Sequence, residues 1–379
     1  MSGAGARTGA PPTALLIYPD EWLGRRRKEW APLASAAAAA GMTAVVAGWR
    51  ALAVEGGRVR AGRCRVQHPG GPLVTARGVA RTPAVVLTTW GVDWGHAPLF
   101  DAIVGTSGCR HTQSSLLGWL DGKCELERCL RAREAATGAR IPRPRTLLPD
   151  EAAAEEGGGL VIVKPSRSGQ CRGIEIVPRD AAAAMAAEVA AGARAPFVAQ
   201  DLVADAFLYR GRRWDARVHA MATSLDPLEV RVYREGVAKT TAAPARPGSG
   251  RLDEWLNAES HRPGGGPAEN LPLTEMLAYV EREHRPLPGF WRRLEALARE
   301  VFAAIAGAAR DWPRPQGRAL LVAGLDLIVE RRGDDGYELR LLEINSHPGL
   351  GWEPRIAAAL APHHRAWFAD MRAAAGGPP

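Results

Sequence analysis

The hydrophobic positions near the beginning of the chain form short apolar runs separated by a helical stretch. Thr13–Tyr18 and Met42–Ala47 are apolar runs of strand length, and the alanine-rich stretch Ser35–Ala40 lies between them. A further apolar run, Pro83–Thr88, follows. Strands that alternate with helices in this way are typical of an α/β domain. We therefore predict a domain of this class over residues 1–115.

A second set of patterns predicts a smaller domain over residues 116–196. Asp121–Thr137 is a charged stretch with helical periodicity, and an apolar strand is predicted at Leu160–Lys164. After a turn rich in serine and glycine, Gly173–Val177 is expected to form the second strand of a hairpin. The alanine-rich segment Asp180–Ala191 predicts a helix that completes the domain.

Longer strand patterns follow and predict an antiparallel sheet in a third domain, residues 197–379. Glu235 and Gly236 predict a turn, Ala243–Pro272 is rich in proline and glycine and predicts a long mobile loop, and Phe290–Arg310 predicts a helix. The predicted strands are Phe197–Val203, Trp214–Thr223, Val230–Tyr233, Ala319–Glu330 and Tyr337–Ile344.

Composition and charge narrow the classes of partner. No apolar run is long enough to cross a bilayer, and the first residues do not form a signal peptide, so we expect a cytoplasmic protein with no membrane partner. The net charge is +8, but no nucleic-acid-binding motif accompanies the arginines, and aromatic residues make up only 6% of the chain. We therefore expect a solvated basic surface and no nucleic-acid partner. The five cysteines form no metal-binding spacing and are expected to be reduced.

Three polar residues interrupt two strongly apolar strands and predict a metal site. Asp326 lies in GLDLIVE, while Glu343 and Asn345 lie in LLEINSHPG and alternate onto one strand face. If the strands pair, two carboxylates and an amide oxygen meet, and such oxygen donors suit Mg²⁺. The alternative is an exposed acidic face on a hairpin, but charged groups within apolar strands are costly unless they bind something.

Two lysines are candidates for phosphate binding. Lys164 ends the apolar strand LVIVK and leads into the flexible segment PSRSGQCRGI, whose backbone amides can cover an anion. Lys123 opens a helix, where the helix N-terminus also attracts anions. Neither segment has the spacing of a Walker A loop, and each lysine alone could equally be solvated.

A third polar group alternates along one strand. Arg213, Asp215 and Arg217 lie on one face of RRWDARVHA. Three charges on one face of an otherwise apolar strand favour a polar cleft, with a solvent-exposed ladder of salt bridges as the alternative.

Five segments, taken in order, resemble the ATP-grasp fold and specifically the tubulin-tyrosine ligase family, from about residue 121 to about residue 355. The resemblance implies an ATP-grasp fold of class α/β (α+β), with a preATP-grasp-like N-terminal domain, a small central domain and a C-terminal antiparallel sheet. The segments are VIVKPSRSGQCRGIEIV, VAQDLV, RRWDARVHAMATSLDPLEVRVYREGVAKT, VAGLDLIV and LLEINSHPGL.

The resemblance also implies roles for individual residues. The phosphates of ATP would contact Lys123 and Lys164, under a loop from Ser166 through Gly169 to Gly173. Adenine would lie along Gln200, Asp201 and Leu202, and the metal ligands would be Asp326, Glu343 and Asn345. Asp215 and Arg217 match the catalytic D-x-R pair of the family. Arg213 stands where the family usually has a lysine, and Lys239 stands where it has an arginine, while Asn257 corresponds to a family asparagine.

The activity implied is that of an ATP- and Mg²⁺-dependent carboxylate–amine ligase. It would join an amino acid or another amine to the carboxylate of a peptide or a small molecule through an acylphosphate, and the positive charge would suit an acidic peptide. One alternative is a kinase of the same fold, which stops after phosphoryl transfer. Others are a non-catalytic nucleotide-binding protein and a basic nucleic-acid-binding protein.

Overall fold

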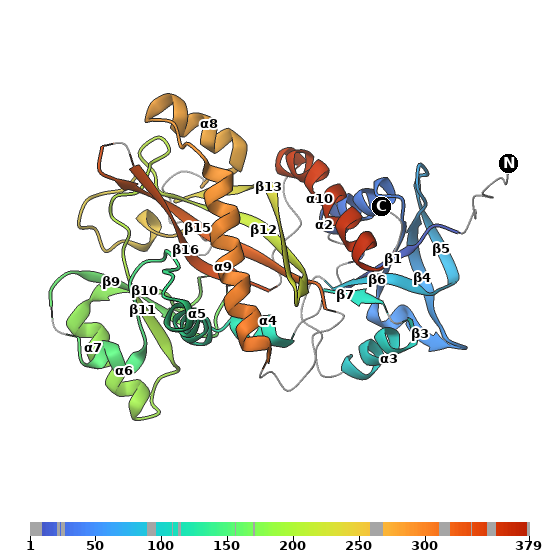
Figure 1. The fold of residues 1–379 in the computed structure, drawn as a ribbon, viewed down its shortest axis with the longest axis horizontal. Helices are drawn as coiled ribbons and strands as arrows, with labels where there is room; N and C mark the ends of the chain where they lie inside the picture. Colours follow the sequence, from blue (N-terminus) through green and yellow to red (C-terminus); the bar gives the residue numbers. More distant parts are fainter. Residues whose placement is uncertain are drawn as a thin grey trace. The chain divides into compact units, whose positions relative to one another are not determined.

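The chain is divided into two compact units in the computed structural model (Figure 1). The first comprises Met1–Gln113, Arg318–Leu320 and Gly349–Pro379, and the second Ser114–Gly317 and Leu321–Pro348. No helix among the described residues is long and apolar enough to span a membrane. The residues that the structure describes are 10–20, 23, 27–88, 96–107, 109–112, 115–155, 157–169, 171–257, 268–310, 319–334, 336–346 and 354–376.

The predicted β-α-β opening of the first unit is confirmed. Strands β1 (Thr13–Tyr18) and β2 (Thr43–Gly48) are parallel neighbours joined through helix α2 (Arg27–Ala39), and β6 (Pro83–Thr88) pairs with the other edge of β1. The strands are buried because their side chains are apolar on both faces. The short strand β7 (Arg110–His111) continues the parallel part.

Antiparallel strands extend this sheet beyond the predicted elements. β2 pairs with β4 (Arg58–Gln67), which also pairs with β3 (Leu52–Glu55) and β5 (Leu73–Arg81). The inward residues of β4 join the strands β1, β2 and β6 and helix α3 (Ala97–Ser107) in one core cluster. The unit also contains the short helix η1 (Trp49–Ala51) and helix α10 (Pro354–Ala374), which packs on α2.

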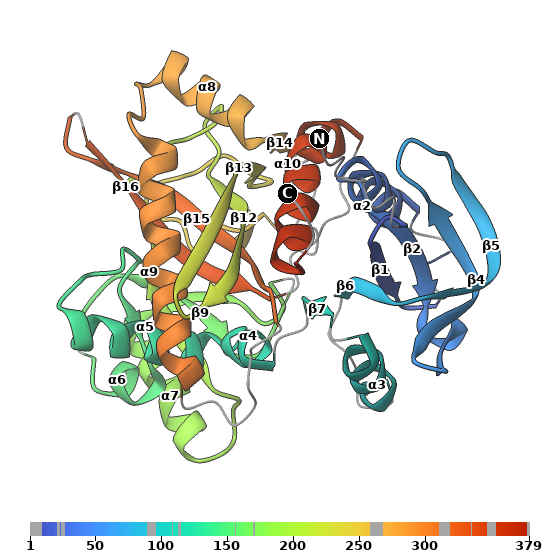
Figure 2. The same cartoon turned by 45° about the vertical axis from the view of Figure 1, so that its right-hand side comes forward.

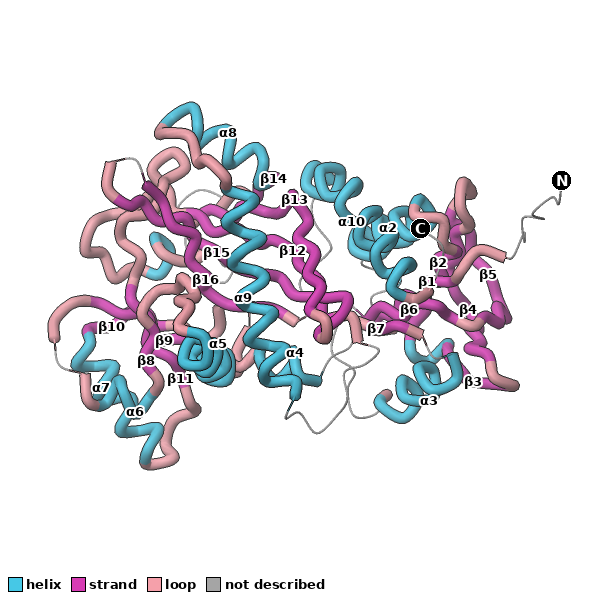
Figure 3. The backbone as a smooth tube through the Cα atoms, viewed as in Figure 1, coloured by secondary structure: helices cyan, strands magenta, loops and turns pink. Residues whose placement is uncertain are grey.

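The second unit contains two antiparallel sheets (Figures 1 and 3). The smaller has the strand order β10-β9-β11-β8, and β9 and β10 form the predicted hairpin. Helix α7 covers one face, where alanines allow close packing against β9 and β11. Its elements are β8 (Thr146–Leu147), α6 (Pro149–Ala153), β9 (Leu160–Pro165), β10 (Glu175–Pro178), α7 (Arg179–Ala190) and β11 (Phe197–Asp201).

The larger sheet has the order β14-β13-β12-β15-β16 and confirms the predicted antiparallel pairing of its strands, whereas the strand predicted at Phe197–Val203 belongs to the smaller sheet as β11. Helix α9 runs across it, and its apolar face packs on β12, β13 and β16 as well as on α5 (Figure 2). The elements are α4 (Ser115–Leu120), α5 (Lys123–Thr137), β12 (Trp214–Leu225), β13 (Leu228–Thr240), η2 (Leu252–Glu254), β14 (Asn270–Pro272), α8 (Leu273–Glu283), α9 (Phe290–Arg310), β15 (Leu321–Arg332) and β16 (Gly336–Asn345).

Two predictions about this sheet are wrong. The turn predicted at Glu235 and Gly236 does not form, because β13 continues through a bulge and pairs with β12 as far as Thr240. Gly236 serves a close approach instead, since a Cβ there would lie 2.5 Å from the carbonyl oxygen of Arg217. The loop predicted over Ala243–Pro272 contains η2 and β14, while its residues 258–267 lie outside the described part.

The close approach at Gly236 makes this position sensitive to added volume. We expect Gly236→Ala to lower the free energy of unfolding by about 1–3 kcal/mol, because the backbone of β12 must move away from the new methyl group. Urea unfolding followed by circular dichroism measures the change. Gly307→Ala is the matched control: its Cβ meets nothing within 4 Å in helix α9, so it should raise stability slightly. Equal effects of the two variants would contradict the packing argument.

Candidate active site

Strand register brings the predicted charged residues into two neighbouring rows on one face of the larger sheet. Asp326 on β15 is the direct cross-strand partner of Arg217 on β12 and of Glu343 on β16. In the neighbouring row, Asp215 on β12 is opposite Lys239 on β13. Directly opposed residues of an antiparallel pair project from the same face. The predicted catalytic and metal-ligating residues therefore share one face of the sheet.

At the centre of these two rows lies a buried network of two cations and two carboxylates. Arg217 donates from Nε and Nη2 to the two oxygens of Asp326, both at 2.7 Å. Lys239 places Nζ 3.3 Å from Oδ2 of Asp326 and 2.9 Å from Oδ1 of Asp215. The amide of Asn257 donates to the other oxygen of Asp215. We call Arg217, Asp326, Lys239 and Asp215 the ion network.

Burial and pairing act against each other in the ion network. Burial alone would raise the pKa of Asp326, but Arg217 and Lys239 outweigh it, so its pKa lies below the ordinary value and the carboxylate stays ionised. Burial raises the pKa of Asp215, and Lys239 offsets only part of that rise. Burial would lower the pKa values of both cations, but the carboxylates raise them above their ordinary values.

Glu343 and Asn345 fit the predicted magnesium site. The carboxylate of Glu343 lies beside Asp326, and within the described part of the chain its one ion pair is a loose contact, 3.5 Å from Nζ of Lys123. The amide nitrogen of Asn345 is buried and has no hydrogen-bond partner among the described residues. Because the nitrogen and oxygen of an amide are interchangeable by a flip, an oxygen donor can take its place. No cluster of three or more His, Cys, Asp or Glu side chains suited to a metal occurs among the described residues, and the predicted set has two carboxylates and one amide.

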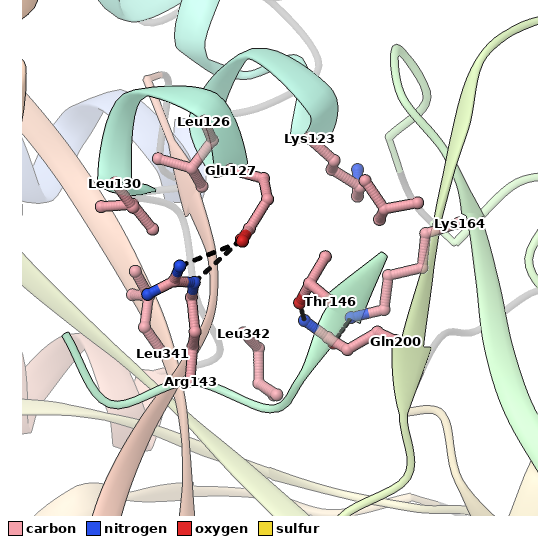
Figure 4. A pocket seen from close by; sticks show the side chains of 11 residues that line it. Lys123, Leu126, Glu127, Leu130, Arg143, Thr146, Lys164, Gln200, Leu341 and Leu342 are labelled. Atoms are coloured by element: carbon pink, nitrogen blue, oxygen red, sulfur yellow. Dashed lines mark hydrogen bonds and ion pairs between the residues drawn. The ribbon is translucent and has the colours of Figure 1, made fainter. Parts of the chain in front are cut away.

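The two predicted phosphate-binding lysines face a small cavity of about 20 Å³ (Figure 4). Lys164 is buried at the end of β9 and donates at 2.7 Å to Oε1 of Gln200, whose amide nitrogen donates to Thr146. Burial lowers the pKa of Lys164, partly offset by Glu343. Lys123 donates from Nζ to the carbonyl oxygen of Ser168 at 3.0 Å. Both lysines thus have neutral oxygen partners that a phosphate can replace.

The loop from Ser166 to Gly173 is tied to helix α5 at its beginning. The hydroxyl of Ser166 accepts from the backbone N–H of Cys124 and donates to Glu125, which satisfies the N-terminus of α5. Further along, the backbone of Arg172 donates to the carbonyl of Gly169, and Gly173 has φ +69°. Gln170 lies outside the described residues.

The predicted adenine linker consists of the last two residues of β11, Gln200 and Asp201, and of Leu202 directly after it, and it has an apolar neighbourhood. Asp201 is held by an ion pair with Arg179 at 2.6 Å, so its side chain is turned to the protein. Leu202 packs against a cluster of three buried apolar side chains, and three further partly buried side chains pack on the same cluster. The buried residues are Ile162, Ile174 and Leu256, and the partly buried ones are Cys171, Ile176 and Leu252.

Arg213 is held by the linker rather than by the ion network. Its guanidinium donates to the carbonyl oxygens of Val203 at 2.8 Å and Ala204 at 3.3 Å. It also stacks on Trp255 with 3.6 Å from Cζ to the ring centre. These contacts connect the end of the linker to the segment around η2.

Sequence reasoning missed several residues that position the site. Asp121 accepts from the backbone N–H and the hydroxyl of Ser346, which joins the segment before Lys123 to the residue after Asn345. Thr146 and Glu125 were missed as well, although each fixes a predicted site residue. No local signal identifies these contacts, because the partners lie far apart in the sequence.

A small antiparallel sheet with a lysine and a loop, beside a larger sheet with a row of carboxylates, is the ATP-grasp arrangement. The model of the tubulin-tyrosine ligase family matches residues 139–363, more than half of the chain, and the protein belongs to this family. A tubulin polyglutamylase, ttll-5 from Caenorhabditis elegans, is 26% identical over 222 residues. These cover 53% of this chain but only 29% of that relative's length.

The ion network predicts unequal stability effects for the two candidate metal carboxylates. Asp326→Asn leaves two buried cations short of a counter-charge and should lower the free energy of unfolding by about 3–5 kcal/mol. Glu343→Gln removes a partly exposed carboxylate with one loose ion pair and should cost below about 1 kcal/mol. Guanidinium unfolding without nucleotide measures both. Similar losses would mean that Asp326 is not the centre of the network.

The position of Arg213 predicts that lysine cannot replace it. One ammonium group cannot reproduce both the stacking on Trp255 and the paired bonds to two carbonyls, so Arg213→Lys should lower stability by about 1–3 kcal/mol. Calorimetric titration with Mg-ATP should show no gain in affinity. A tighter complex in the variant would indicate that a lysine here contacts nucleotide directly.

Proposed function

We propose that this protein is an ATP-dependent carboxylate–amine ligase that forms an amide bond through an acylphosphate. The row Arg217–Asp326–Glu343, with Lys123 and Lys164 beside it, is the observation that carries the proposal. It combines carboxylates for a metal with cations for phosphates in a chain of the tubulin-tyrosine ligase family. The C. elegans relative is named a polyglutamylase, which is also an amide-forming activity.

In the proposed mechanism, ATP binds to the second unit. Lys123 and Lys164 bind its phosphates after exchanging their neutral oxygen partners for phosphate oxygens. The adenine packs against the apolar cluster around Leu202 and follows the linker from Gln200. Asp326, Glu343 and Asn345 would hold Mg²⁺, which supplies charge neutralisation for the phosphates.

The chemical part consists of two transfers. An oxygen of the acceptor carboxylate attacks the γ-phosphorus, the bond to the β-phosphate oxygen breaks, and ADP leaves. The amine nitrogen then attacks the acyl carbon, and inorganic phosphate leaves with the electrons of the broken carbon–oxygen bond. Asp215, with its raised pKa, is the candidate acceptor for the proton that the amine loses.

The cations of the ion network retain capacity for this reaction. Arg217 uses two of its five N–H donors for Asp326, which leaves three for the γ-phosphate and the acceptor carboxylate. Lys239 uses two of its three donors. Preorganised donors of this kind stabilise the charge of the transferring group without reorganising during the reaction. The loop from Ser166 to Gly173 is the proposed cover that excludes water from the acylphosphate.

The test is phosphate release from Mg-ATP with pools of amines and carboxylate acceptors. Release should require both partners, and mass spectrometry should find an amide product. Lys164→Met and Glu343→Gln should each lower turnover by about 10²-fold or more, because each removes a group that stabilises developing charge. Glu295→Gln, at a partly exposed ion pair between α9 and Arg234 of β13, is the matched control and should retain activity.

Two outcomes would replace the proposal. A phosphorylated acceptor that accumulates without amide, at a rate independent of the amine, would favour a kinase. Calorimetry without any Mg-ATP binding would favour a protein that has lost nucleotide chemistry.

A further inference from the structure

Asp121 connects the beginning of helix α5 to the end of strand β16. The pairing of β15 with β16 ends at Gly324 and Asn345. The next backbone N–H along the chain, that of Ser346, donates to Oδ1 of Asp121 at 2.7 Å, and the hydroxyl of Ser346 donates to Oδ2. Ser346 is buried and Asp121 is partly buried. One carboxylate therefore holds, by both of its oxygens, the residue that follows the predicted metal ligand Asn345.

The turn that carries Asp121 leads directly to a predicted phosphate-binding lysine. The backbone N–H groups of Asp121 and Gly122 donate to carbonyl oxygens of helix α4 at 2.9 and 3.1 Å. Lys123 follows, and its backbone N–H donates to the carbonyl oxygen of Ser166 at 3.0 Å. These three consecutive residues are thus fixed by backbone hydrogen bonds. Whatever Asp121 holds is therefore placed at a defined distance from Lys123.

This distance matters because a metal ion and the phosphates of a nucleotide bind together. The other described contact between these two segments is the ion pair of Lys123 with Glu343, which is long at 3.5 Å and made by a flexible side chain. The two hydrogen bonds from Ser346 to the short side chain of Asp121 constrain the spacing more tightly. Residues that orient metal ligands in this way commonly set the affinity for the metal.

We propose that Asp121 is a positioning residue for the metal, which holds the end of β16 so that Asn345 and Lys123 act on one metal–nucleotide complex. The proposal rests on the function proposed above and adds to it a residue that contacts neither metal nor nucleotide. Its role is geometric rather than that of a further metal ligand, because both carboxylate oxygens accept from Ser346.

The test measures Mn²⁺, a paramagnetic substitute for Mg²⁺, by electron paramagnetic resonance with the full chain and ADP. Asp121→Ala removes both acceptors and should weaken Mn²⁺ binding about tenfold or more. Asp121→Asn removes the charge but keeps the geometry, since its amide oxygen can accept from the N–H of Ser346 and its amide nitrogen can donate to the hydroxyl. Its affinity for Mn²⁺ should stay within about threefold of the wild type.

Glu235→Ala is the matched control. The carboxylate of Glu235 also accepts from the backbone N–H and the hydroxyl of one residue, Thr274 in the first turn of α8, at 3.1 and 2.6 Å. This variant should bind Mn²⁺ as the wild type does. If Asp121→Ala does not fold, Ser346→Ala replaces it: this variant loses the hydroxyl contact alone and should bind Mn²⁺ roughly threefold more weakly, without any change in charge.

The outcomes separate the positioning role from the proposed function. Unchanged Mn²⁺ affinity in Asp121→Ala or in Ser346→Ala would overturn the role of Asp121, as would equal weakening in Glu235→Ala. An Asp121→Asn variant as weak as Asp121→Ala would mean that the charge acts and not the geometry, which also overturns it. A wild type that binds no Mn²⁺ would overturn the metal site, and the proposed function with it.

Discussion

The bidentate contact between Arg217 and Asp326 is the interaction on which the site depends. Removing a carboxylate from water costs several kcal/mol unless its charges and lone pairs are matched, and here two cations supply donors to both oxygens. The contact crosses β12 and β15 in direct register, so it fixes the row of the sheet in which Glu343 stands, and Lys239 reaches it from the neighbouring row. The same bonds that stabilise buried charge therefore also set the geometry for the chemistry.

The balance of charge explains where an anion can enter. The cations of the site exceed the carboxylates by one: Lys123, Lys164, Arg217 and Lys239 stand against Asp215, Asp326 and Glu343. Each cation except Lys164 has a carboxylate within 3.5 Å, whereas Lys164 bonds to the neutral amide of Gln200. Burial lowers the pKa of Lys164, so an approaching phosphate gains most by stabilising its charged form. The electrostatic surplus thus lies at the end of β9.

Sequence reasoning succeeded where each element carries its own signal. Apolar runs such as Thr13–Tyr18 and Pro83–Thr88 predict their strands to the residue, and alternation in β12, β15 and β16 places the charged residues on one face. It failed where local signals conflict. Buried and exposed residues alternate along strand β4, but the alternation shifts by one position at Gly62, where two consecutive residues are exposed. The many arginines of this strand also give it the polar composition of a loop. Gly236 was predicted to lie in a turn because glycine is frequent in turns, whereas here it permits the close packing of two strands.

The part of the site that was not predictable consists of contacts between segments distant in sequence. Ser166 lies in the loop predicted to bind phosphate, yet its hydroxyl accepts a hydrogen bond from the N-terminus of α5. The contact between Asp121 and Ser346 joins residues 225 positions apart. Such contacts tie the loop and the end of β16 to the segment around Lys123. They depend on tertiary packing, which no periodicity encodes.

Arg213 illustrates the consequence for reasoning from resemblance. The resemblance implies a lysine at this position, and a charge-conserving replacement suggests a conserved role. A guanidinium, however, is a planar fork that can bond two carbonyls and stack on an aromatic ring at once. In this chain the arginine connects the end of the linker to Trp255. The positive charge is therefore retained in the sequence, but its hydrogen bonds go to backbone carbonyl groups. In the proposed function, nucleotide recognition then falls more heavily on Lys164 and Lys123, the two lysines whose neutral oxygen partners a phosphate can displace.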